Sequence, residues 1–149
     1  MKIYLDNCCY NRPYDNQGQM RIFLETQAKL HIQGLVLNKK LELVCSFILS
    51  YENHENPDLA HRDSIAQFLV NASSYIGIEC MEDIRQIASE LMQQGIKMKD
   101  AVHLACAISA ECDYFITTDD KLLKNYAGDK IKIRSPLTFL DDLEEKTNA

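Results

Sequence analysis

Short apolar runs alternate along the chain with longer segments in which apolar residues recur every three or four positions. The runs indicate buried strands, and the three-to-four spacing indicates helices. The pattern predicts five strands, at residues 2–5, 41–46, 75–80, 113–117 and 131–134. It predicts helices at residues 20–37, 46–53, 81–94, 101–111, 120–126 and 136–145, and a further helix that starts at Pro57. Residues 7–19 are predicted to form a polar loop.

Two of the predicted helices have informative apolar faces. In the helix at residues 20–37, the residues that repeat near the helical period are expected to face the core: Met20, Phe23, Leu24, Leu30, Gly34 and Leu37. The helix at residues 101–111 carries small and apolar residues, namely Ala101, Leu104, Ala105 and Ile108. This composition predicts a helix that packs closely and is mostly buried.

Strands alternate with helices throughout the sequence, and this order predicts an α/β fold. Parallel strands need crossover connections, so we expect a largely parallel sheet covered by helices on both faces. Two helices, rather than one, separate the third and fourth predicted strands. A length of 149 residues fits one domain that spans residues 1–149.

The composition is that of a folded protein with a core of its own. Hydrophobic residues make up 46% of the chain, but no apolar run is long enough to cross a membrane. The opening sequence MKIYLDN lacks the apolar segment of a secretory signal, so we expect a cytoplasmic protein without a membrane partner. The six cysteines form no Cys-x-x-Cys pair and are predicted to be reduced thiols that pack as small hydrophobes.

The net charge of −6 at first sight disfavours a nucleic-acid partner, because phosphate contacts need Lys and Arg. Basic residues nevertheless accompany the segments that lead to one edge of the predicted sheet: Arg12, Lys97, Lys99, Lys121, Lys124, Lys130, Lys132 and Arg134. They predict either a modest phosphate-binding rim or an ordinary solvated surface of mixed charge.

Acidic residues gather at the same predicted edge. In an open parallel sheet, ligands bind beyond the carboxyl ends of the strands. Carboxylates follow three of the strands and open the helix that leads into the fourth strand: Asp6, Glu52 with a rival at Glu55, Asp100, and Asp119 with a rival at Asp120. That helix must run antiparallel to the strand, so its first residues also lie at this edge.

Each acid taken singly has a structural explanation as a helix cap, a turn residue or part of a solvated helix face. Four carboxylates from four segments at one edge repel one another and are costly to bury. A hard divalent cation with oxygen ligands relieves that repulsion, and Mg²⁺ or Mn²⁺ suits carboxylates better than Zn²⁺ does. The sequence therefore predicts a carboxylate metal site.

Three segments carry a family resemblance: Ile3-Tyr4-Leu5-Asp6-Asn7, the run from Met98-Lys99-Asp100 to Ala107, and Phe115-Ile116-Thr117-Thr118-Asp119. Together they resemble the PIN domain, the fold of many toxin ribonucleases of the VapC kind, over essentially the whole chain. Asp6, Glu52, Asp100 and Asp119 match the acidic positions of that family, and Thr117 matches its hydroxyl residue. The resemblance implies a three-layer fold with a five-stranded sheet in the order 3-2-1-4-5.

The resemblance also implies an endoribonuclease that depends on Mg²⁺ or Mn²⁺ and hydrolyses RNA phosphodiester bonds. Asp6, Asp100 and Asp119 would hold the metal, and Glu52 would be a further ligand or an outer partner. Thr117 would orient the acids, and Asn7 would either support Asp6 or be a turn residue. The implied partners are RNA, an antitoxin protein and a second copy of the chain in a homodimer.

Two other functions compete with this interpretation. A catalytically weak or inactive PIN module would act through a protein partner instead of cleaving RNA. A metal-dependent phosphatase on a related sheet would place a second Asp two residues after Asp6, where this chain has Cys8. That mismatch disfavours the phosphatase.

Overall fold

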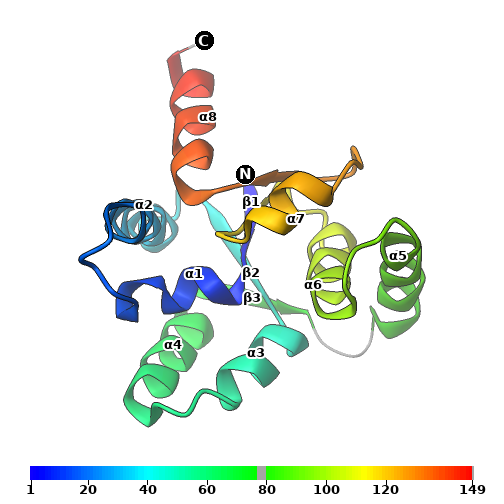
Figure 1. Cartoon of the computed structure of the whole chain (residues 1–149), viewed down its shortest axis with the longest axis horizontal. Helices are drawn as coiled ribbons and strands as arrows, with labels where there is room; N and C mark the ends of the chain where they lie inside the picture. Colours follow the sequence, from blue (N-terminus) through cyan, green and yellow to red (C-terminus); the bar gives the residue numbers. More distant parts are fainter. Residues whose placement is uncertain (77–79, 149) are drawn as a thin grey trace.

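The computed structural model describes residues 1–76 and 80–148, and it shows a central sheet between two layers of helices (Figure 1). The strands are β1 (Lys2–Leu5), β2 (Glu42–Ser46), β3 (Ser73–Ile76), β4 (Tyr114–Ile116) and β5 (Lys132–Arg134). They pair in parallel in the order β3-β2-β1-β4-β5. The expected α/β fold and its strand order are thus confirmed.

The helices are α1 (Asn7–Asn11), α2 (Met20–Leu37), α3 (Phe47–His54), α4 (Leu59–Ala72), α5 (Met81–Gln93), α6 (Met98–Ser109), α7 (Asp120–Asn125) and α8 (Pro136–Asn148), with a 3-10 turn η1 (Arg12–Tyr14). Within the described residues, no helix has both the length and the apolar character that a membrane crossing needs.

Side chains alternate across the strands and form two separate cores. Tyr4, Val44 and Phe115 point to one face and pack with α5, α6 and α7. Their neighbours Ile3 and Ile116 point to the other face and pack with α1, α2, α4 and α8. All six cysteines are free thiols, as expected of small hydrophobic residues in these cores. The two cores hold the sheet rigidly between them, so the positions of its carboxyl ends are well defined.

Several element boundaries differ from the sequence prediction, among them the start of α6 at Met98 instead of residue 101. Strand β3 starts at Ser73 instead of residue 75, and residues 77–79 of the predicted strand lie outside the described residues. Helix α4 begins at Leu59, because Asp58 caps it by accepting a hydrogen bond from the His61 N–H. The predicted polar loop after β1 is wrong over residues 7–14, where α1 and η1 lie, and is confirmed over residues 15–19. The side chain of Asp6 caps α1, which explains why a helix can start there.

The predicted inner face of α2 is also wrong. The expected stripe points outward, with Met20 71% exposed and Phe23, Leu24, Leu30 and Leu37 exposed as well. The buried positions of this helix are Glu25, Thr26, Ala28, Lys29, Ile32 and Val36. Glu25 tolerates burial because Arg12 donates two hydrogen bonds to its Oε1, at 3.0 and 2.7 Å. A partner 13 residues away therefore decides which side of α2 faces inward.

Lys29 is a buried cation whose removal should stabilise the fold. It is 6% exposed and donates to Gln33 Oε1 at 2.7 Å, and burial lowers its pKa to about 8. The unfolded state then binds more protons than the native state, so stability should rise between about pH 8 and pH 10.5. We expect Lys29→Met to raise the free energy of unfolding at pH 7 by up to about 3 kcal/mol, because burial lowers the pKa of Lys29 from 10.5 to about 8.

Urea denaturation at pH 7 and pH 11 checks this prediction. The stability gained by the variant should shrink at pH 11, where Lys29 is neutral in both states of the wild type. An equal gain at both pH values would show that packing, and not the charge, is the cause.

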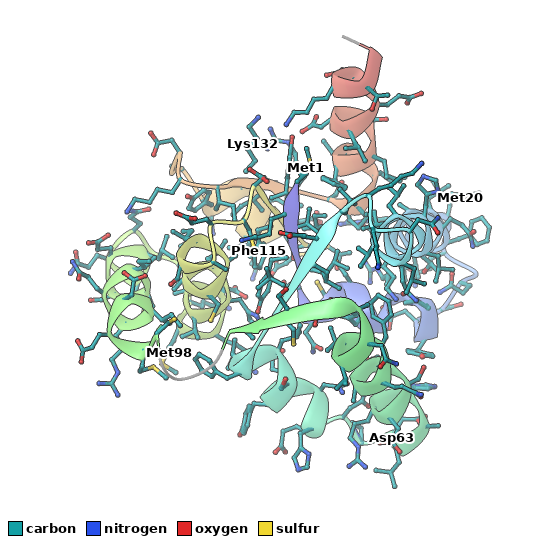
Figure 2. All side chains as sticks on the ribbon, turned by 180° about the vertical axis from the view of Figure 1, so that it is seen from behind. Met1, Met20, Asp63, Met98, Phe115 and Lys132 are labelled. Carbon is teal, nitrogen blue, oxygen red and sulfur yellow. The ribbon has the colours of Figure 1, made fainter. Side chains whose placement is uncertain are left out.

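The helical pair before β4 places one candidate acid at the edge of the sheet. Helix α6 packs on β2 and β4, and α5 lies beside α6 on the side away from the strands (Figure 2). The turn between the two helices uses Gly95 at φ +94°, a backbone conformation that favours glycine. Helix α6 starts at Met98 with Lys97 as its N-cap, so Asp100 lies in the first turn and is not the cap.

Candidate functional site

Asp6 lies where β1 ends and is held by three hydrogen bonds, one from its backbone and two to its carboxylate. Its backbone N–H donates to the Ile116 carbonyl at 2.9 Å, which continues the pairing of β1 with β4. Its Oδ1 accepts from the Asn7 N–H at 2.8 Å, and its Oδ2 accepts from the Thr117 hydroxyl at 2.8 Å. The carboxylate is almost fully buried, so these contacts fix its direction.

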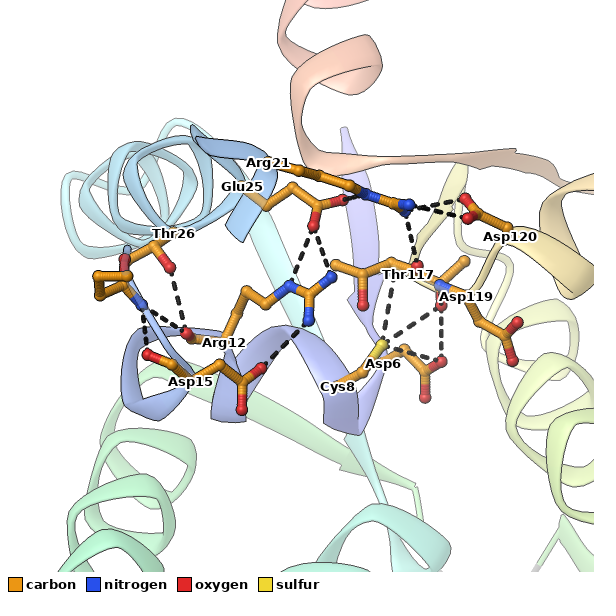
Figure 3. Close-up of polar contacts among 12 residues, drawn as sticks. Asp6, Cys8, Arg12, Asp15, Arg21, Glu25, Thr26, Thr117, Asp119 and Asp120 are labelled. Carbon is orange, nitrogen blue, oxygen red and sulfur yellow. Dashed lines mark hydrogen bonds and ion pairs between the residues drawn. The ribbon is translucent and has the colours of Figure 1, made fainter. Parts of the chain in front are cut away.

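Thr117 connects Asp6 to Asp119. While its hydroxyl donates to Asp6, the same oxygen accepts from the Asp119 N–H at 3.1 Å (Figure 3). Asp119 in turn caps α7, since its Oδ1 accepts from the Lys121 N–H at 3.0 Å. Thr117 is fully buried, so this bridge sets the spacing of two acids that follow neighbouring strands.

Asp100 joins these two acids from α6. It lines a small pocket of about 70 Å³ together with Asp119, Lys97 and Lys121. Burial raises the pKa of Asp100, and the negative charges of Asp6 and Asp119 raise it further. The three carboxylates are therefore near enough to repel one another, and we refer to Asp6, Asp100 and Asp119 as the aspartate cluster.

The aspartate cluster has the ligand chemistry of a site for a hard cation. All its side-chain donors are carboxylate oxygens, partly withdrawn from water, and their mutual repulsion would be relieved by a positive charge. Within residues 1–76 and 80–148, however, no three His, Cys, Asp or Glu side chains are already gathered into a group that could hold a metal ion. The residue types fit Mg²⁺ or Mn²⁺, and binding would have to draw the carboxylates closer together.

Glu52 on α3 is the acid that faces α6. Its Oε1 lies 2.5 Å from Nε2 of the buried His103. Burial opposes the charged form of Glu52, but the hydrogen bond and charge of His103, aided by Lys99 and Asn7, lower its pKa overall. Its rival Glu55 follows the last residue of α3 and is exposed. The structure therefore places Glu52, and not Glu55, beside the site.

An ion pair with Arg21 directs the Asp120 side chain away from its neighbour Asp119. Both carboxylate oxygens of Asp120 accept from the Arg21 guanidinium at 2.8 Å, and Arg21 also donates to the Thr118 carbonyl at 3.2 Å (Figure 3). Asp120 is 58% exposed and points toward α2. Asp119, rather than Asp120, is therefore the acid that shares a pocket with Asp100.

Only part of the predicted basic rim lies at the site. Lys97 and Lys121 line the pocket of Asp100, and Lys99 is near enough to Glu52 to lower its pKa. Three of the other basic residues have acidic partners elsewhere: Arg12 pairs with Glu25, Lys130 with Glu90, and Arg134 with Asp142. The positive charge at this edge of the sheet is thus carried mainly by lysines.

The sequence analysis missed His103 and Tyr4. His103 is 1% exposed, and its Nδ1 lies 2.6 Å from the hydroxyl of the fully buried Tyr4. The same hydroxyl lies 2.6 Å from Ser46 Oγ. The spacing in the sequence could have indicated His103. It stands three residues after Asp100, so it lies on the same side of the helix, one turn further on.

Cys8, two residues after Asp6, packs against the Asp6–Thr117 contact. Its Sγ lies 3.4 Å from Thr117 Oγ1 and 3.5 Å from Asp6 Oδ2. It also accepts a hydrogen bond from the Thr118 N–H at 3.4 Å. The thiol therefore packs against the two side chains that position the aspartate cluster.

No protein-family model matches the chain, and no curated protein sequence matches it significantly. Solved structures do resemble it. VapBC2 from Rickettsia felis, bound to a DNA fragment from its promoter, is 16% identical, with a TM-score of 0.57 over 91% of this chain and 98% of that one. FitAcB from Neisseria gonorrhoeae is 15% identical, with a TM-score of 0.56 over 91% and 98%. FitAB bound to an IR36 DNA fragment is 17% identical, with a TM-score of 0.59 over 90% and 94%.

These similarities cover nearly the full length of both chains, and at this level of identity they establish the fold. The chain has the fold of the PIN domain, with the sheet order and flanking helices that the sequence resemblance implied.

Proposed function

We propose that this PIN-fold chain is a metal-dependent endoribonuclease and the toxin of a toxin–antitoxin pair. One observation carries the proposal: Asp6, Asp100 and Asp119 come from three separate segments to one end of the sheet, where Glu52 lies beside them. A purely structural role would not call for four carboxylates that repel one another at a single edge.

In this proposal the aspartate cluster would hold Mg²⁺ or Mn²⁺. A bound ion of this kind lowers the pKa of a coordinated water and neutralises negative charge on the phosphate. Thr117 would keep Asp6 and Asp119 at a fixed spacing, as its two hydrogen bonds do in the structure. Asp6 and Asp119 each use one carboxylate oxygen to cap a helix. Asp100 is therefore the acid of the cluster whose side chain has the most freedom to move toward a metal ion.

The remaining residues would act directly on substrate and water. Lys97 and Lys121 lie beside Asp100 and Asp119 and would contact phosphate oxygens of RNA. Glu52 has a lowered pKa and is ionised at neutral pH, so its second oxygen, Oε2, would accept a proton from the attacking water. The water oxygen would bond to phosphorus as the bond to the leaving ribose oxygen breaks.

Incubation of the protein with single-stranded RNA and Mn²⁺ or Mg²⁺ tests this function. We expect cleavage that a chelator abolishes and that excess metal restores. Because water is the proposed nucleophile, an oligonucleotide with a 2′-deoxy sugar at the cleavage position should still be cut. Absence of cleavage with either metal over a broad set of RNA sequences would contradict the nuclease proposal.

The similar structures supply the basis for a protein partner. Their names describe complexes of two proteins, and two of these complexes are bound to DNA. By analogy, we propose an antitoxin as the partner of this chain in the cytoplasm. A homodimer is also part of the proposal. Co-expression with the product of a neighbouring gene, followed by co-purification, tests the antitoxin, and sedimentation of the isolated chain tests the dimer.

A second function has one observation in its favour. The described acids are not gathered into a ready metal site, as would suit a catalytically weak PIN module that acts by binding a protein. Such a module would bind its partner with the same affinity after Asp100→Asn, whereas the nuclease would lose RNA cleavage through that change.

A further inference from the structure

A continuous line of hydrogen bonds leads from the core of the sheet to Glu52. Ser46 Oγ lies 2.6 Å from the Tyr4 hydroxyl, which lies 2.6 Å from His103 Nδ1. His103 Nε2 then lies 2.5 Å from Glu52 Oε1. The four residues come from β2, β1, α6 and α3, so the line joins four elements at the edge of the sheet that carries the aspartate cluster.

The burial of this line shows that it is not an incidental surface contact. Ser46 and Tyr4 are fully buried, and His103 is nearly so. Buried polar groups without partners are costly, and here both ring nitrogens of His103 have one. A histidine that only filled the core would not need an acid of the candidate site as its outer partner.

The donor can be assigned at the outer end of the line. The pKa of Glu52 is lowered, so its carboxylate is ionised and Oε1 can only accept. Nε2 of His103 therefore carries a proton and donates it to Glu52. Further in, burial raises the pKa of Tyr4 well above its usual value, so its hydroxyl keeps its proton and shares hydrogen bonds with His103 Nδ1 and Ser46 Oγ.

We propose that His103 is a positioning residue of the ribonuclease site, with its Nε2–H holding Glu52 Oε1 so that Glu52 stays beside Asp100. This inference rests on the proposed nuclease function. The Tyr4 hydroxyl fixes the tilt of the imidazole through its contact with Nδ1, in the way that outer partners orient the ligands of metal sites. Glu52 Oε1 is thereby committed to His103, and only Oε2 is left to act on water.

Three substitutions separate positioning from simple packing. His103→Leu removes both ring contacts, whereas His103→Gln retains an N–H donor that can reach Glu52. Tyr4→Phe removes only the hydroxyl that fixes the ring. We expect His103→Leu to lower kcat about 10- to 100-fold with KM changed less than about twofold, as for the loss of outer partners in metal sites. His103→Gln should recover part of that loss, and Tyr4→Phe should fall between wild type and His103→Leu.

Tyr114→Phe is the matched control for Tyr4→Phe. Tyr114 is buried on β4, but its hydroxyl donates to Asp142 at 3.3 Å, away from Glu52. Both changes remove one hydroxyl from a buried tyrosine of the sheet. Tyr114→Phe should therefore leave kcat at the wild-type value, and an equal loss in both variants would overturn the positioning role.

A second readout does not require activity. Nitrogen-15 NMR of the histidine side chains should show a proton on Nε2 of His103, and Glu52→Gln should shift that resonance. If the wild type cleaves no RNA but these signals are present, the nuclease proposal fails while the contact stands. If the wild type cleaves RNA, the inference is overturned by an unprotonated Nε2 or by a wild-type kcat in both His103→Gln and Tyr4→Phe. His103→Leu enters the comparison only if its circular dichroism spectrum matches that of the wild type.

Discussion

Asp119→Asn is expected to lower the rate of RNA cleavage by more than about 100-fold, since losing even an outer partner of a metal ligand costs 10- to 100-fold. The change removes one negative charge from the aspartate cluster and keeps the shape of the side chain. Asparagine also caps helices well, so the hydrogen bonds that start α7 should survive and the chain should fold. Cleavage of a labelled RNA under single-turnover conditions, with circular dichroism as the test of folding, measures the effect.

Asp120→Asn is the matched control for this experiment. It makes the same chemical change one residue further along the chain, where the carboxylate is exposed and bonded to Arg21. Cleavage by this variant should stay within about twofold of wild type, because exposed ion pairs contribute little. If Asp120→Asn were inactive and Asp119→Asn active, the assignment of the two residues would be reversed.

Saturating Mn²⁺ is expected to raise the melting temperature of the wild type. A ligand that binds only the folded state stabilises it by about 2.7 kcal/mol at 100 times its Kd, or roughly 5–10 °C for a chain of this size. Differential scanning calorimetry with and without Mn²⁺ measures the shift. An unchanged melting temperature at millimolar Mn²⁺ would argue strongly against a metal site at the aspartate cluster.

Asp100→Asn should change how the melting temperature depends on Mn²⁺. Burial and the charges of Asp6 and Asp119 raise the pKa of Asp100, so its ionised form destabilises the metal-free protein. Without metal the variant should melt at a higher temperature than the wild type near neutral pH. That advantage should shrink as the pH falls below the raised pKa, because the wild-type residue is then protonated in the native state. With Mn²⁺ the variant should gain little.

The order of strands and helices could be predicted from the sequence because each depends on local pattern. Apolar runs such as Ile3-Tyr4-Leu5 and Tyr114-Phe115-Ile116 form strands that are buried on both faces, and such strands need no alternation. The acids that follow these runs lie at the carboxyl end of a parallel sheet by topology alone. Asp6 and Asp119 are therefore candidates from the sequence alone, and Asp100 joins them because it opens the helix that leads back into β4.

Local pattern failed where one segment had two possible faces. Helix α2 has apolar residues on its exposed side and charged residues on its buried side, so periodicity pointed the wrong way. Glu25 is buried because Arg12, from a different segment, neutralises it. No spacing rule within the helix contains that information.

The sequence by itself determined the fold class and the set of acids, since both follow from the order of apolar runs and the residues that end them. Only the tertiary structure decided between the rivals within that set. His103 engages Glu52 and not Glu55, and Arg21 engages Asp120 and leaves Asp119 beside Asp100. The two contacts join residues that are 51 and 99 positions apart in the sequence, respectively. Such contacts form only when the chain is folded.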